Sequence, residues 1–178
     1  MSEAVPGRAA ILFDRDGVLN VDEGYAYDPA RLRWIGGARE AVKAANEAGV
    51  LAIVVTNQSG IGRGYYTEAQ MHAFHAAMQA DLAQLGARID ALYFAPHHED
   101  AAEPRYRVAD HPDRKPNPGM LLRAMNEHGI DPARTVMIGD KPSDMEAARR
   151  AGVRGVLFKG GDLLSIVETL ITQWQVTA

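Results

Sequence analysis

The chain has 178 residues, 47% of them hydrophobic and 24% charged, an ordinary composition for one globular domain with a substantial core. Its formal net charge of −4 and the lack of a basic stripe argue against nucleic acid as the main partner. The sequence has no cysteine, which excludes disulfides, thiolate metal sites and a cysteine nucleophile.

The sequence also gives expectations about location and assembly. No apolar run reaches about 18 residues, so we expect no membrane span and no membrane partner. The first ten residues, "MSEAVPGRAA", lack the basic-then-apolar pattern of a signal peptide, which favours a cytoplasmic location. We expect residues 1–178 to form a single domain and the protein to be a monomer.

The first half of the chain alternates short apolar runs with longer amphipathic ones. Apolar runs predict buried strands at 9–13, 50–56 and 89–95. Helical spacing predicts a helix over 37–49 and a longer one that begins after Thr67, a suitable N-cap, and ends near residue 85. His72 and His75 lie within this second helix, and we expect them at the surface or partly buried rather than as ligands.

The second half continues the alternation. The stretch "PNPGMLLRAMNEHG" predicts a helix that ends at Gly129. Strands are expected at 135–139 and 155–158, and helices at 143–152 and 162–174. Two segments, 17–36 and 96–116, lack helical spacing, and the second is rich in histidine, proline and charge.

Strands that alternate with helices, and that are apolar throughout, are typical of a parallel sheet covered on both faces. The expected fold class is therefore α/β, a three-layer, Rossmann-like, doubly wound parallel sheet. No connection is long enough to form a large cap domain. In such sheets ligands bind beyond the carboxyl ends of the strands, so the residues that follow each strand are the candidates for chemistry.

Polar residues follow the predicted strands at several places. Asp14 and Asp16 follow the first strand, Thr56 and Asn57 the second, and Asp140 the fourth. Lys115 precedes the third helix, and Asp144 comes shortly after Asp140; these must reach the same edge of the sheet. The sequence therefore predicts several carboxylates, a hydroxyl and a cation around one centre.

Such a centre suits magnesium and phosphate. Carboxylate oxygens bind Mg²⁺, which usually also binds substrate phosphate. Thr56 and Lys115 can donate hydrogen bonds to phosphate oxygens. One aspartate can attack phosphorus and another can transfer a proton. A divalent cation also explains how Asp14 and Asp16 tolerate each other, because it offsets their repulsion.

Four stretches, "FDRDGVLN", "VVTNQSG", "RKPNPGM" and "IGDKPSDMEAARRAG", resemble in order the four motifs of the haloacid dehalogenase superfamily of phosphatases. Further stretches, "NVDEGY", "NQSGIGRGYYTEAQ" and "APHH", resemble one branch of that superfamily. That branch contains D-glycero-D-manno-heptose 1,7-bisphosphate phosphatase and histidinol-phosphate phosphatase. The resemblance implies a Mg²⁺-dependent phosphatase that acts on a small phosphorylated metabolite through an aspartyl-phosphate.

The resemblance also implies a role for each matching residue. Asp14 is then the nucleophile and Asp16 the general acid and base. The metal ligands are Asp14, the backbone carbonyl of Asp16, and Asp140, while Asp144 orients Lys115. The residues implied to contact phosphate or the rest of the substrate are Thr56, Lys115, Asn57, Arg63, Arg114 and Asn20.

The chain departs from this branch in one loop. The branch typically carries a structural zinc there, held by three cysteines and one histidine, whereas this sequence keeps His97, His98 and His111 without any cysteine. With Asp110 and Asp113 nearby, a His/Asp zinc site is one interpretation. The other is a metal-free loop held by hydrogen bonds, salt bridges and prolines. We favour the second, because tetrahedral sites without cysteine are usually catalytic.

Other functions fit the same residues. The substrate can be heptose 1,7-bisphosphate, histidinol phosphate or another sugar phosphate. A receiver-like module also presents Asp, Thr, Lys and Mg²⁺ on a parallel sheet, but Asp16 beside the nucleophile favours rapid hydrolysis over a lasting phosphoaspartate. A sugar phosphotransferase and a catalytically silent binding protein are further alternatives.

Overall fold

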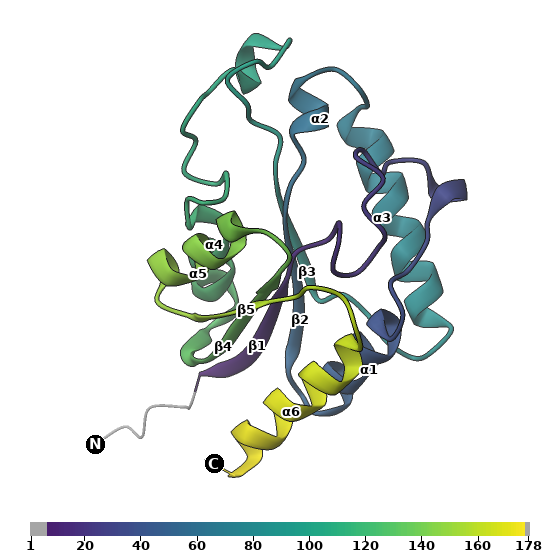
Figure 1. Ribbon diagram of the computed structural model, residues 1–178, viewed down its shortest axis with the longest axis vertical. Helices are drawn as coiled ribbons and strands as arrows, with labels where there is room; N and C mark the ends of the chain where they lie inside the picture. Colours follow the sequence, from purple (N-terminus) through teal and green to yellow (C-terminus); the bar gives the residue numbers. More distant parts are fainter. Residues whose placement is uncertain (1–6, 177–178) are drawn as a thin grey trace.

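The computed structural model describes residues 7–176, which fold around one five-stranded parallel sheet (Figure 1). The strand order is β3-β2-β1-β4-β5. The strands are β1 (Arg8–Phe13), β2 (Leu51–Asn57), β3 (Ala91–Ala95), β4 (Ile130–Gly139) and β5 (Arg154–Leu157). The helices are α1 (Ala38–Glu47), α2 (Ser59–Gly62), α3 (Glu68–Ala83), α4 (Gly119–His128), α5 (Pro142–Ala151) and α6 (Leu163–Val176), with 3₁₀ turns η1 (Pro29–Arg31) and η2 (Pro104–Tyr106).

The molecule has three layers, because helices cover both faces of the sheet. Side chains of a strand alternate between its faces, and β1 is buried on both. Ile11 and Phe13 pack in the core that includes residues of α1, α3 and α6, while Ala10 and Leu12 pack in the core that includes residues of α4 and α5. Figure 1 shows these two groups of helices on opposite sides of the sheet.

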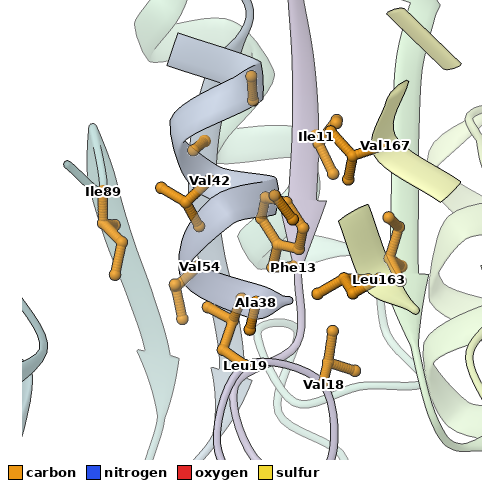
Figure 2. Packing of buried hydrophobic residues seen from close by; sticks show 14 of the residues in the cluster. Ile11, Phe13, Val18, Leu19, Ala38, Val42, Val54, Ile89, Leu163 and Val167 are labelled. Carbon is orange, nitrogen blue, oxygen red and sulfur yellow. The ribbon is translucent and has the colours of Figure 1, made fainter. Parts of the chain in front are cut away.

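The larger core lies between the sheet and helices α1 and α6. Figure 2 shows Ile11 and Phe13 of β1 between Val42 of α1 and Leu163 and Val167 of α6. All five side chains are fully buried. Burial of a side chain of this size stabilises the fold by about 1.5–3 kcal/mol relative to an exposed one.

A third, smaller cluster lies apart from the two main cores, beyond the carboxyl ends of the strands. It joins α2 and the start of α3 to the loop between β3 and α4. Its buried members are Ile61, Tyr66, Met71, Ala101 and Tyr106, with Tyr27 and Phe94 packed against them. We call this group the loop cluster.

The expected fold class is confirmed: the sheet is parallel and covered on both faces, and the 23 residues between β3 and α4 hold only the short turn η2. Within the part of the chain described, no helix is long and apolar enough to cross a membrane. That residues 1–178 form a single domain stays a prediction, which one sheet containing every described strand supports.

The expected helix signals are also present. The Thr67 hydroxyl accepts a hydrogen bond from the backbone N–H of Gln70, whose side chain returns to the Thr67 N–H and completes a capping box. Gly129 ends α4 in the left-handed conformation, with φ of 61°.

Some boundaries differ from the expected ones. Strand β4 begins at Ile130 rather than at residue 135, because Ile130 pairs with Arg8 of β1 and Thr135 with Ala10, and residues 131–134 lie in the register shift between these two pairs. Strand β3 begins at Ala91 rather than at residue 89. The two turns η1 and η2 and the single-turn helix α2 lie in segments without helical periodicity.

The substitution Ile11→Ala should lower the free energy of unfolding by about 2–5 kcal/mol, because it leaves a cavity against the central strand. Equilibrium unfolding in urea measures this value. Leu122→Ala is the matched control, since Leu122 is 47% exposed on α4 and its truncation should cost far less. Equal losses in the two variants would contradict the layered core described above.

Candidate active site

A buried lysine lies between two buried carboxylates at the carboxyl end of the sheet. The Lys115 Nζ donates to Asp14 Oδ1 at 2.9 Å and to the Val55 carbonyl at 2.9 Å, and lies 2.6 Å from Asp144 Oδ1. The exposed fractions of these three charged residues are 4%, 5% and 1%. Residues from β1, α5 and the loop before α4 therefore meet, as the strand-end rule predicts.

The charges in this cluster shift one another's pKa. Burial opposes the charge of Lys115, but the carboxylates of Asp14 and Asp144 outweigh it and raise the Lys115 pKa above its ordinary value. Burial raises the pKa of Asp14 to about 7, and the charges of Asp144 and Asp16 add to this rise, while Lys115 opposes it. Lys115 therefore stays charged, while burial opposes the ionisation of Asp14.

A third carboxylate completes a possible metal site. Ligand oxygens of Asp14, Asp140 and Asp144 lie within 4.8 Å of one another. Oδ1 of Asp140 is buried and makes no hydrogen bond to any described residue. Hard carboxylate oxygens grouped in this way, with one of them unpartnered, fit a divalent cation such as Mg²⁺.

Gly17 is needed for this arrangement. Its φ is 85°, a conformation that favours glycine, and a Cβ there would lie 2.2 Å from Oδ2 of Asp140. The turn after Asp16 can therefore approach the Asp140 carboxylate only because residue 17 has no side chain.

Asp16 is held by several donors rather than left free. Its carboxylate accepts hydrogen bonds from Arg15 through Nε and Nη2, at 2.9–3.2 Å. It also accepts from Asn20 Nδ2 at 2.9 Å and from Gln58 Nε2 at 3.1 Å. The general acid and base expected from the sequence is thus fixed by local contacts before any substrate is present.

Thr56 is buried at the end of β2, with 1% of its surface exposed. Its hydroxyl oxygen accepts a hydrogen bond from Gln58 Nε2 at 2.9 Å, the same amide that donates to Asp16. The Tyr66 hydroxyl donates to Gln58 Oε1 and thereby fixes the orientation of the amide. Gln58 therefore links the predicted phosphate ligand to the predicted acid.

The charged cluster opens into a cleft of about 490 Å³. A smaller cavity of about 60 Å³ lies beneath it and is lined by Asp14 and Asp144. Five residues line both spaces: Asp16, Asn57, Lys115, Lys141 and Ser143. The other residues that line the cleft are Asp22, Gly24, Tyr25, Ala26, Gln58, Ser59, Tyr66, Arg114 and Pro116.

The remaining predicted site residues take different places. Asn57 lines the cleft, and its side chain exchanges two hydrogen bonds of 3.0 Å with the backbone of Lys115. Arg114 also lines the cleft and donates to the His97 carbonyl. Arg63 contacts the His98 ring at 2.8 Å, outside the set of cleft-lining residues.

Asn20, expected from the resemblance to contact substrate, is 1% exposed and contacts the Asp16 carboxylate. In this structure Asn20 therefore helps to position Asp16, the predicted general acid.

The loop after β3 brings two of its three histidines together. The rings of His97 and His111 stack at 3.4 Å with 6° between their planes. Burial lowers the pKa of His97, and a charge on His111 would lower it further. Nδ1 of His111 accepts from the Asp113 N–H, and Nδ1 of His98 accepts from the Asp100 N–H, so two ring nitrogens already have partners.

Several residues near the site were not identified from the sequence. They are Arg15, Asp22, Tyr25, Gln58, Tyr66, His75, Lys141 and Ser143. Four of these lie in the quoted motifs shortly after strands, and that position is their only sequence signal: Arg15, Gln58, Lys141 and Ser143. The prediction that His75 lies at the surface or is partly buried was wrong. His75 is buried, with 7% of its surface exposed, and it contacts Arg15.

The chain is similar in sequence to known proteins over most of its length. The family model described as HAD-hyrolase-like matches residues 113–164. The chain is 40% identical, over 98% of its own length and 97% of the relative's, to D-glycero-beta-D-manno-heptose-1,7-bisphosphate 7-phosphatase of Rhodopseudomonas palustris. It is 42% identical to the protein of the same name in Escherichia coli, over 86% of this chain and 78% of the relative.

A solved structure resembles the fold over most of its length. D,D-heptose 1,7-bisphosphate phosphatase from B. bronchiseptica, complexed with magnesium and phosphate, superposes with a TM-score of 0.82 at 28% identity. The superposition covers 93% of this chain and 99% of that one.

The raised pKa of Asp14 predicts a pH-dependent stability when no divalent cation is present. Because this pKa is about 7 in the folded state and 3.8 is its ordinary value, the folded state binds a proton more tightly than the unfolded chain between these values. Stability should therefore fall as pH rises from about 4 to 7.

In a chelating buffer at pH 8, Asp14→Asn should raise the melting temperature above that of the parent, by about 2–4 °C for each kcal/mol gained. The difference should shrink near pH 4. Melting curves at both pH values measure it, and a variant that is less stable than the parent at pH 8 would contradict the unfavourable burial of the Asp14 charge described above.

Proposed function

The chain belongs to the haloacid dehalogenase-like hydrolases and is a phosphatase, and from this premise we propose that it hydrolyses a sugar bisphosphate, D-glycero-D-manno-heptose 1,7-bisphosphate, at the 7-phosphate. The observation that supports the proposal most directly is the cluster of the buried Asp14, Asp144 and Lys115 with the half-buried Asp140, beneath an open cleft. The substrate name comes from relatives at about 40% identity over most of the chain.

The residues that would hold Mg²⁺ are Asp14, Asp140 and the backbone carbonyl of Asp16. When bound, the ion would supply positive charge that keeps the carboxylates ionised and neutralises phosphoryl oxygens. Asp144 lies in the same cluster, but its contact with Lys115 and with the Lys141 N–H suits it to orient those groups. The magnesium bound to the B. bronchiseptica relative supports this choice of ion.

In the first step, a carboxylate oxygen of Asp14 attacks phosphorus, and the bond from phosphorus to the sugar oxygen breaks. Asp16 donates a proton to the departing sugar oxygen, so that an alcohol rather than an alkoxide leaves. Lys115 remains charged and donates N–H groups to the phosphoryl oxygens, which fits its raised pKa. The products of this step are the alcohol and an aspartyl-phosphate on Asp14.

In the second step, water attacks phosphorus and Asp16, now a carboxylate, accepts a proton from it. The bond between phosphorus and Asp14 breaks, inorganic phosphate leaves, and both carboxyl groups return to their starting state. Thr56 remains a predicted phosphate ligand; its hydroxyl accepts from Gln58 and donates to the Asn57 carbonyl at 3.5 Å, a long contact that a phosphate oxygen would replace.

The cleft suits a substrate with a second anionic group. Arg114 and Lys141 line it on different segments, and the volume of about 490 Å³ is within the range of small-molecule sites. Histidinol phosphate and other sugar phosphates remain alternative substrates. The receiver-like alternative is not favoured, because the relatives are phosphatases.

We further propose that the protein works as a cytoplasmic monomer in carbohydrate metabolism and takes a small molecule, not nucleic acid, as its partner. These points remain predictions.

Phosphate release from a panel of esters tests the proposed function. The panel contains heptose 1,7-bisphosphate, fructose 1,6-bisphosphate and histidinol phosphate, each with Mg²⁺ and with a chelator. The heptose substrate should give the highest kcat/KM, and the chelator should abolish turnover. Asp14→Asn should lower kcat by roughly 10³-fold or more, because no nucleophile remains.

Glu47→Gln, an exposed carboxylate on α1, is the matched control and should keep the parent rate. Unchanged turnover in Asp14→Asn would overturn the nucleophile assignment. A higher kcat/KM for another ester would overturn only the assignment of the substrate.

We also propose that the loop after β3 is metal-free. The ring stack of His97 and His111 and the hydrogen bond from Arg114 to the His97 carbonyl support this proposal. Among the described residues, the only group of three or more potential ligands is the aspartate cluster. Elemental analysis of protein purified without a histidine tag should find far less than one zinc per chain, and a stoichiometric zinc content would contradict the proposal.

A further inference from the structure

Arg15 is a buried cation that the proposed chemistry leaves unexplained. It lies between the two aspartates of the first motif and has no exposed surface. A buried cation is costly unless its charge and its hydrogen-bond donors are satisfied. The contacts of its guanidinium group therefore show what the fold gains from it.

The guanidinium group of Arg15 contacts four other residues. Its Nε and Nη2 donate to the Asp16 carboxylate, and Nη2 also donates to the Ala26 carbonyl at 2.6 Å. Its Nη1 lies 3.0 Å from Nε2 of His75, and its Cζ lies 4.7 Å from the centre of the Phe74 ring. Phe74 and His75 are neighbours on α3, so that helix fixes the side of Arg15 that faces away from Asp16.

The chemistry of the contact fixes the state of His75. Arginine only donates hydrogen bonds, so Nε2 of His75 must be the acceptor, and the ring is neutral with its proton on Nδ1. Burial, the charge of Arg15 and the nearby His72 lower the pKa of His75 to about 3, in agreement with a neutral ring. His75 therefore serves as a fixed acceptor.

The position of Asp16 indicates how these contacts would assist the reaction. Asp16 lines both the inner cavity, which holds Asp14 and Asp144, and the outer cleft. A group that protonates the leaving oxygen must lie between the phosphoryl group and the rest of the substrate, and this is the junction of the two spaces. A carboxylate that can rotate away from that junction would lose much of its effect.

We propose that Arg15 and His75 are positioning residues: His75 on α3 holds the Arg15 guanidinium group, which in turn holds Asp16 at the junction where it delivers a proton to the leaving group. The proposal rests on the proposed phosphatase mechanism. It assigns no direct contact with substrate to either residue.

The proposal makes a prediction that depends on the leaving group. A sugar alkoxide is a poor leaving group and needs a proton from Asp16, whereas nitrophenolate leaves readily without one. Displacing Asp16 should therefore slow hydrolysis of heptose 1,7-bisphosphate much more than hydrolysis of p-nitrophenyl phosphate. The measured quantity is the ratio of the two kcat values, sugar ester over aryl ester.

Four variants separate positioning from folding. His75→Leu removes the acceptor, and Arg15→Lys removes the forked contact with Asp16; each should lower the ratio about tenfold or more. His75→Gln places an amide oxygen near the position of Nε2 and should keep the ratio close to that of the parent. His72→Leu, one turn earlier on α3 with its side chain 57% exposed, is the matched control and should also keep it.

Each outcome decides one question. A ratio unchanged in Arg15→Lys overturns the inference, whatever His75→Leu does. Equal losses on both esters in His75→Leu and Arg15→Lys also overturn it, because they indicate damage to the fold. If His75→Leu does not fold, Arg15→Lys and His75→Gln carry the test. A parent protein that hydrolyses neither ester would instead overturn the proposed function itself.

Discussion

The ion pairs of Lys115 with Asp14 and Asp144 are the interaction on which the rest of the site depends. Removal of an ion from water costs several kcal/mol, and only close contact with opposite charge offsets this cost. Lys115 makes two such contacts and also donates to a backbone carbonyl. The chain must therefore return from the long loop after β3 and place this residue against β1 and α5. The paired hydrogen bonds between Asn57 and the Lys115 backbone hold it there.

A second ion pair, between the buried Arg15 and the partly buried Asp16, lies beside the first and differs in kind. In the first, two carboxylates face one lysine, and burial raises the pKa of Asp14. In the second, one cation faces one carboxylate, and two neutral groups, the Ala26 carbonyl and the His75 ring, accept further hydrogen bonds from the cation. An unbalanced cluster is suited to attract a metal ion and to react, while a balanced pair is suited to stay in place. The two neighbouring aspartates thus receive different surroundings from residues far apart in the sequence.

Much of this arrangement follows from the sequence alone. Apolar runs predict all five strands, and the strand-end rule predicts that Asp14, Asp140, Asp144 and Lys115 lie close together. The start of β4 was missed because residues 131–134 form no apolar run, and only the pairing of Ile130 with Arg8 of β1 extends the strand back to that point. A local sequence pattern predicts a strand when burial of that strand produces the pattern. It does not predict a strand residue that is placed by pairing with a distant segment.

The site shows the same division. His75 reads as one polar residue on a helix, and nothing near it in sequence indicates that Arg15, sixty positions earlier, donates to its ring. Gln58 and Tyr66 likewise gain their roles from the way α2 and α3 pack over the strand ends. The resemblance to known phosphatases identified the reacting groups. The residues that hold those groups in place depend on side-chain packing, which the periodicity of the sequence does not predict.

The loop cluster has a consequence for how such a cleft can change over time. Tyr66 belongs to that cluster and also lines the cleft, while the two main cores stabilise the sheet independently. Because mutations at distant sites act nearly independently, replacements among Ile61, Ala101 and Tyr106 can reshape the outer wall without loosening the strands that carry the reacting carboxylates. During evolution, the substrate can therefore change through a few aromatic and aliphatic substitutions in this cluster, while the strands and their catalytic aspartates stay the same.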